Sequence, residues 1–134
     1  MLSTTPQTRP RAVLFDAYGT LFDVFSVAQL AEDLYPGHGQ ALSVLWRDKQ
    51  IEYTRLVTTC NHGLHYQPFG ALTRAALVYA IKKIALSRYI SSTTSQFDQI
   101  FQEKHGPSVQ RLLEQYQHLS AFPENLAVLQ KLKA

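Results

Sequence analysis

The first regular pattern along the chain is a short apolar run, AVLF at residues 12–15, which follows ten polar and proline-bearing residues. Continuous apolar runs of about four to eight residues are typical of strands that are buried on both faces of a sheet. We therefore predict a strand over 12–15. After Leu21 no run predicts a second strand, although a buried strand needs hydrogen-bonding neighbours on either side. The chain thus offers one strand of a sheet that its own residues do not complete.

From Ser26 onward, apolar positions recur every three or four residues, which is the period of a helix. The stretch SVAQLAEDLY predicts a helix that ends at Pro36–Gly37. The best-defined helix covers 40–57, and another follows a predicted loop at 60–69. The apolar stripes of these two helices consist of Leu42, Leu45, Trp46, Tyr53, Leu56 and Val57 in the first, and Leu72, Ala76, Leu77, Ile81 and Ile84 in the second.

Polar and proline-containing breaks predict the remaining helix boundaries. Ser95 and Asp98, at the end of the polar stretch SSTTS and just beyond it, have the spacing of a capping box. Gly106–Pro107 and Pro123 are expected to punctuate two further helices. The predicted architecture is one strand followed by helices, without an internal repeat.

Composition excludes several classes of protein. A length of 134 residues suits one modest domain. The net charge of +3 is spread along the chain and its basic residues are not interleaved with aromatic ones, which argues against binding of nucleic acid. The longest apolar stretch, at 75–81, is too short to span a membrane, and the leader lacks the apolar core of a secretory signal. Because the single cysteine, Cys60, cannot form an internal disulfide, a cytoplasmic protein is expected.

The candidate chemistry centres on Asp16, which stands where the 12–15 run ends and a Gly19–Thr20 turn begins. Ligands of open α/β sheets bind in the crevice beyond the carboxyl ends of the strands, where such an acid would stand. An ionised carboxylate there can act as a covalent nucleophile toward carbon or phosphorus, while glycine permits close approach and Thr20 offers a hydroxyl. The alternative role for Asp16 is that of a turn or helix-capping carboxylate.

Two motifs resemble one family. FDAYGTLFDV at 15–24 resembles the first motif of the haloacid dehalogenase superfamily, in its L-2-haloacid dehalogenase branch, and LWRDKQIEYTRL at 45–56 resembles the first cap helix of that branch. The resemblance implies an α/β fold, with a Rossmann-like core and a helical cap, of which this chain would hold the first strand and a mostly helical cap. It divides the chain into the core strand with its nucleophile loop at 1–25, the cap at 26–120 and a helix returning to the core at 121–134.

The reaction that the resemblance implies is hydrolytic dehalogenation of a short L-2-haloalkanoic acid through an aspartyl ester. In that reaction Asp16 is the nucleophile, Thr20 is a hydrogen-bond donor to its carboxylate, and Arg47 binds the substrate and draws away the halide. The sequence has no Asp or Glu three or four residues from Arg47. A salt bridge within the helix therefore does not account for this arginine. Substrate contacts are also implied for Ala17, Tyr18, Ile51 and Phe69.

Position 18 separates dehalogenation from the phosphatase chemistry of most superfamily members. Phosphatases carry a second aspartate there, which protonates the departing alkoxide, whereas this chain has Tyr18. Halide leaves without a proton, so the tyrosine fits carbon–halogen displacement better. No metal or other cofactor is then expected; the partner is the haloacid, and a homodimer is expected of the full-length enzyme. A magnesium-dependent phosphatase of the same superfamily and a non-catalytic helical interaction module are the alternatives.

Some features lie outside this scheme. Cys60, His62 and His65 have a spacing that could place ligands near one metal, but no second cluster completes a tetrahedral set, so ordinary loop residues are expected. Asp48 stands where a neutral polar residue is expected in relatives. The resemblance places the remaining catalytic groups after Ala134, so the chain by itself is expected to be an inactive fragment.

Overall fold

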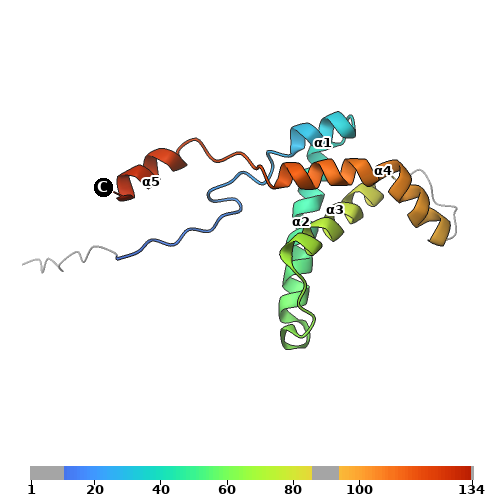
Figure 1. Cartoon of the computed structure of the whole chain (residues 1–134), viewed down its shortest axis with the longest axis horizontal. Coiled ribbons are helices and arrows are strands. Elements are labelled where there is room, and N and C mark those ends of the chain that lie inside the picture. Colours follow the sequence, from blue (N-terminus) through green and yellow to red (C-terminus); the bar gives the residue numbers. More distant parts are fainter. Residues whose placement is uncertain (1–10, 86–93, 134) are drawn as a thin grey trace, which may run out of the picture. The chain divides into compact units, whose positions relative to one another are not determined.

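The computed structural model describes residues 11–85 and 94–133, most of which are helical (Figure 1). The described residues form two compact units, one of which holds the residues up to Asp23 together with those from Ala121 onward, while the other is Val24–Ser120. Which unit corresponds to a core and which to a cap stays a prediction. The elements are α1 (Ala28–Leu34), α2 (Gly39–Thr59), a 3₁₀ helix (Cys60–Gly63), α3 (Phe69–Ala85), α4 (Thr94–Tyr116) and α5 (Asn125–Lys133).

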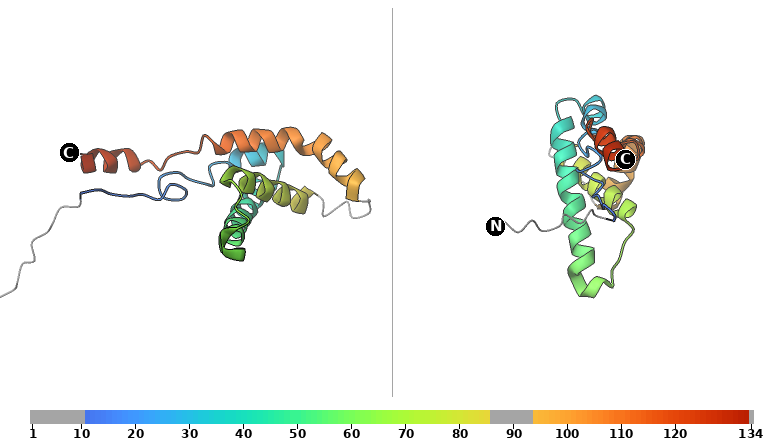
Figure 2. Two further views of the ribbon diagram at one scale, coloured as in Figure 1. Left: turned by 60° about the horizontal axis from the view of Figure 1, so that its bottom comes forward. Right: turned by 90° about the vertical axis from the view of Figure 1, so that its left-hand side faces the viewer.

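The unit Val24–Ser120 is a packed helical unit. In it α2 packs against α1 and α3, and α4 packs against the same two helices (Figures 1 and 2). The predicted stripe of α2 is confirmed at its start, but Leu56 is 48% exposed because the packed cluster extends along α2 only as far as Tyr53. The buried cluster consists of Val27, Ala31, Leu42, Trp46, Ala76, Leu77, Ala80, Ile81, Phe101, Val109 and Leu112.

The turn between α1 and α2 is closed by Glu32. Its carboxylate oxygens accept hydrogen bonds from the N–H groups of Gly37 (2.5 Å) and Gly39 (2.8 Å). These two backbone hydrogen bonds lower the pKa of Glu32. Gly37 has φ +79°, so the predicted glycine stop after the first helix is confirmed. The carboxylate thereby satisfies an N–H group of the turn and that of the first residue of α2, where the helix dipole favours negative charge.

The strand predicted over 12–15 is not formed. Residues 12–17 carry no regular structure, and Val13, Leu14 and Phe15 are 46%, 95% and 41% exposed. The nearest pairings are isolated β-bridges that involve Phe22. A strand is stabilised by hydrogen bonds to neighbouring strands and by burial of its faces, and the described residues supply neither.

Predicted boundaries shift at two places. Ser95 is the second residue of α4 and therefore lies inside the helix, not at a capping position before it. Asp98, the other member of the predicted capping box, instead pairs with Lys82 of α3 at 2.6 Å. The segment 60–69, predicted as a loop, begins with a 3₁₀ helix and ends at Phe69, which is already the first residue of α3.

Pro107 does not separate two helices, contrary to the prediction, because α4 continues through it. Proline removes one N–H and crowds the carbonyl of the preceding turn, which kinks a helix without necessarily ending it. Figure 1 shows such a bend along α4. Phe101 and Val109, on either side of the proline, are both buried, so packing holds both halves in helical conformation.

No helix in the described part of the chain is both long and apolar enough to cross a bilayer.

Replacement of Gly39 by alanine should destabilise the helical unit. An added Cβ would lie 2.5 Å from the backbone nitrogen of Glu32 and 2.6 Å from its Cα, atoms that can move only with α1. We expect the free energy of unfolding to fall by about 1–3 kcal/mol, as in other overpacked sites. Urea denaturation measures this loss. Gly70→Ala is the control, because a Cβ there meets no atom within 4 Å; it should be neutral or slightly stabilising. Equal stability of the two variants would contradict the packing of α1 on α2.

The half-buried His105 should make stability depend on pH. Its Nδ1 lies 3.1 Å from the Tyr35 hydroxyl, and the two rings stack with centroids 5.8 Å apart. Burial, and to a smaller extent the charge of Lys104, lowers the pKa of His105 below its usual 6.5. The unfolded chain therefore takes up more protons as the pH falls through 6.5. Stability should decrease from there down to the folded pKa and then level off.

Melting temperatures measured between about pH 7.5 and pH 5 test this dependence. His105→Gln should flatten the decrease that begins near pH 6.5. An unchanged profile in the variant would show that another group causes it.

Candidate active site

Asp16, the predicted nucleophile, is exposed and precedes a tight turn. At the turn, Gly19 has φ +96°, a left-handed conformation that favours glycine. The Gly19 N–H donates to the carbonyl of Phe22 at 2.8 Å, and the Phe22 N–H donates to the carbonyl of Ala17 at 2.9 Å. The Thr20 hydroxyl donates to Asp16 Oδ2 at 3.2 Å. The turn therefore holds one carboxylate oxygen in a hydrogen bond while the group stays accessible.

This turn is also hydrogen-bonded to the first residue of α5 and to the segment before it. The Leu21 carbonyl accepts hydrogen bonds from the Asn125 side-chain amide at 2.5 Å and from the Phe122 N–H at 3.2 Å. The N-terminal and C-terminal segments of this unit are thus joined at Leu21.

Arg47 lies on α2 and is half-buried. Its Nη1 donates to the Oε1 of Gln50 at 2.8 Å. Gln50 is 1% exposed, and its amide is bonded at both atoms: Oε1 also accepts from the Tyr116 hydroxyl at 3.0 Å, and Nε2 donates to the Thr73 hydroxyl at 2.7 Å. A buried amide with hydrogen-bond partners at both its oxygen and its nitrogen therefore holds one edge of the guanidinium.

The same hydrogen bonds reach a second predicted site residue. The Thr73 hydroxyl donates to the carbonyl of Phe69 at 2.8 Å, and Trp46 Nε1 donates to the carbonyl of Thr73 at 2.9 Å. The Trp46 and Tyr116 rings pack with centroids 5.0 Å apart. Arg47 on α2 and Phe69 at the start of α3 are thus connected through side chains in the interior.

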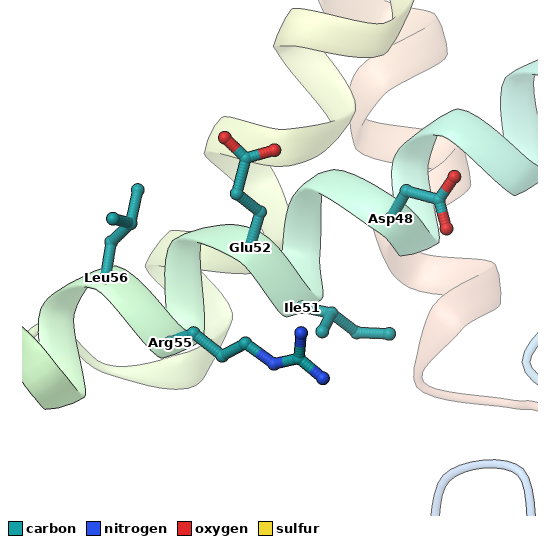
Figure 3. A pocket seen from close by; sticks show the side chains of 5 residues that line it. All are labelled: Asp48, Ile51, Glu52, Arg55 and Leu56. Carbon is teal, nitrogen blue, oxygen red and sulfur yellow. The ribbon is translucent and has the colours of Figure 1, made fainter.

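Ile51, predicted as a pocket wall, lines a shallow groove on α2 together with Asp48, Glu52, Arg55 and Leu56 (Figure 3). In Figure 3 Ile51 and Arg55 project to one side of the helix, and Glu52 and Leu56 to the other. Asp48 is exposed, so its carboxylate adds negative charge beside Ile51. Position 48 is one at which the chain departs from its relatives, in which a neutral polar residue is expected.

The structure brings the predicted residues together in two groups. The first group lies around the Gly19 turn, and the second lies on α2 and the start of α3. Each group belongs to a different compact unit, and the catalytic and binding roles of its members stay predictions. The first group is Asp16, Ala17, Tyr18 and Thr20, and the second is Arg47, Ile51 and Phe69.

Sequence reasoning missed Gln50 and Thr73. The available indication was position: Gln50 follows Trp46 by one helical turn and so falls on the apolar stripe of α2, where a polar residue must find a partner. The partner itself, Thr73, lies on another helix and no local pattern indicates it. Within 11–85 and 94–133 there is no cluster of three or more side chains suited to hold a metal ion.

No family model matches the chain. An (S)-2-haloacid dehalogenase, H-109, from Pseudomonas putida is 38% identical over 122 residues, which cover 91% of this chain and 46% of the relative.

Solved structures match as well. A crystal structure of an L-2-haloacid dehalogenase has a TM-score of 0.74 and 46% sequence identity, over 94% of this chain and 49% of that one. The L-2-haloacid dehalogenase from Xanthobacter autotrophicus with chloropropionic acid covalently bound has a TM-score of 0.58 and 31% identity, over 81% of this chain and 36% of that one.

The fold is therefore that of the haloacid dehalogenases, an α/β class of which this chain carries a mostly helical part. Within that class the chain matches L-2-haloacid dehalogenases, as its two motifs predicted. It spans about half the length of the curated relatives that it matches.

Thr73→Val should destabilise the helical unit by removing the acceptor of the buried Gln50 amide. An unpaired buried donor costs about 1–3 kcal/mol. Urea unfolding followed by the fluorescence of Trp46, the single tryptophan, measures the loss. Thr58→Val is the matched control, since Thr58 is exposed on the same helix as Gln50 and its hydroxyl bonds to a carbonyl of that helix. It should change stability by less than about 0.5 kcal/mol. Similar effects of the two variants would mean that Gln50 finds another acceptor.

Proposed function

We propose that this chain supplies the nucleophile loop and the cap helices of an enzyme that hydrolyses short L-2-haloalkanoic acids to 2-hydroxy acids. The match of 122 residues to an (S)-2-haloacid dehalogenase carries the proposal. The exposed Asp16 carboxylate, bonded to Thr20 beside a glycine turn, supports it with a geometry suited to a nucleophile.

In the proposed reaction, one Asp16 oxygen attacks the carbon that bears the halogen. The new carbon–oxygen bond forms as the carbon–halogen bond breaks, and the halide leaves with the bonding electron pair. Water then adds to the carbonyl carbon of the aspartyl ester; one proton passes to the product hydroxyl and one to solvent, and the carboxylate is restored. Because the substrate carbon is attacked once, from the side opposite the halogen, its configuration inverts.

The side chains around these steps have distinct roles. The hydrogen bond from Thr20 to Oδ2 orients the Asp16 carboxylate and leaves Oδ1 for the attack. Arg47 supplies positive charge for the halide as it departs and for the substrate carboxylate. Ala17, Tyr18, Ile51 and Phe69 would contact the substrate. Tyr18 in place of a second acid fits a leaving group that needs no proton.

The proposal extends to assembly and location. A homodimer of the whole enzyme is proposed from the family resemblance. A cytoplasmic location is proposed from the single, exposed Cys60, which suits a reducing compartment.

The whole enzyme, made by joining this chain to the remaining part of a relative, should release chloride from L-2-chloropropionate in the presence of EDTA and yield the D-hydroxy acid. Chloride release and chiral chromatography of the product measure both outcomes. Asp16→Asn should lower turnover at least about a thousandfold, because an amide is not a nucleophile. The chain of 134 residues alone should release no chloride.

Asp33→Asn, a change at an exposed acid of α1, is the control and should leave turnover unaffected. Full activity in Asp16→Asn would refute the aspartyl-ester mechanism. A strict requirement for magnesium would favour the phosphatase alternative.

A further inference from the structure

Gln50 has no part in the chemistry above, yet it is the most connected polar side chain around Arg47. We infer that Gln50 is a positioning residue, which fixes the Arg47 guanidinium and keeps it in register with Phe69 at the start of α3. The inference rests on the proposed function, because it is there that Arg47 meets the substrate.

The hydrogen bonds define the orientation of the Gln50 amide. A guanidinium has donors and no acceptor, so Arg47 must face the amide oxygen, as it does at 2.8 Å. The amide nitrogen then faces Thr73, whose own hydroxyl proton is directed to the Phe69 carbonyl. If the amide oxygen and nitrogen of Gln50 exchanged places, the N–H donors of the amide would face the N–H donors of Arg47. The side chain therefore has one arrangement.

Burial makes this arrangement rigid. Gln50 is 1% exposed, so rotation of its side chain would leave an amide unpaired in the interior. Hydrogen bonds from a charged donor are stronger than neutral ones, and a low local dielectric strengthens them further. Arg47 has a long, flexible and only half-buried side chain, and the buried acceptor reduces the orientations open to it.

The same amide connects α2 to α3. A shift of the first turn of α3 would displace the Thr73 hydroxyl, which is 2.7 Å from Gln50 Nε2, and with it the acceptor of Arg47. Phe69, 37% exposed, is the residue of that turn for which a substrate contact is proposed. The charged contact from Arg47 and the apolar contact from Phe69 are therefore coupled through one interior side chain.

A double-mutant cycle in the joined enzyme separates positioning from simple stabilisation. Gln50→Leu keeps a similar volume and removes the acceptor; it should lower kcat/KM by about tenfold, the effect of losing one hydrogen bond to a charged group. Arg47→Lys should lower it as well. In the Arg47→Lys background, Gln50→Leu should cost little more, because its effect on catalysis passes through the guanidinium.

Two further variants provide a rescue and a control for this cycle. Gln50→Glu, which keeps an acceptor for Arg47, should recover part of the lost kcat/KM. Ser43→Ala is the control, since Ser43 is a buried polar residue of α2 that bonds to the Gln40 carbonyl and lies outside this set of hydrogen bonds. It should leave kcat/KM unchanged even if it lowers stability.

The outcomes are distinguishable. Equal losses from Gln50→Leu in both backgrounds would show a structural role and overturn the inference. Unchanged activity in Arg47→Lys would instead refute the role of Arg47 in the proposed function.

A second measurement needs no activity and uses the chain of 134 residues. With ¹⁵N-labelled arginine, the Arg47 guanidinium, assigned by its loss in Arg47→Lys, should show slow rotation about its Nε–Cζ bond. Gln50→Leu should abolish that restriction and Gln50→Glu should retain it. An Arg47 signal that is the same in all three forms would overturn the inference, whatever the activity of the joined enzyme.

Discussion

The packing of α2, α3 and α4 depends on one buried amide, that of Gln50. Its oxygen binds Arg47 of its own helix and Tyr116 of α4, and its nitrogen binds Thr73 of α3. Apolar contacts tolerate small shifts of one helix along another, whereas an unmade hydrogen bond in the interior costs the full desolvation of the group. Among the described side chains no buried nitrogen or oxygen lacks a partner. The amide therefore specifies the register of the three helices that their apolar faces hold together.

The two charged groups of the proposed reaction are positioned in different ways. The Asp16 loop owes its shape to hydrogen bonds between near neighbours, from Ala17 to Phe22, around a glycine with positive φ. Arg47 owes its position to residues 26 and 69 places further along the chain, Thr73 and Tyr116, which act through Gln50. The nucleophile is thus set by local backbone geometry and the arginine by tertiary packing.

This difference also explains what the sequence could predict. Helices over 40–57 and from 70 onward followed from periodicity, because amphipathic packing is encoded locally. The Asp16 and Thr20 pair followed from a motif within one turn. The strand over 12–15 failed because a strand requires partners outside its own residues. Pro107 failed as a boundary because burial on both of its sides outweighs the loss of one helical hydrogen bond.

The two units also differ in how far their apolar side chains are buried. No side chain of α5 is buried, and its nine residues fall short of the roughly 12–15 at which isolated helices are marginally stable in water. Leu126 and Leu132 are 67% and 53% exposed, like the apolar residues that precede Asp16. The helical unit Val24–Ser120, in contrast, contains the whole buried cluster. Substitutions inside that cluster are therefore expected to act on the proposed chemistry through Arg47, which belongs to the same unit.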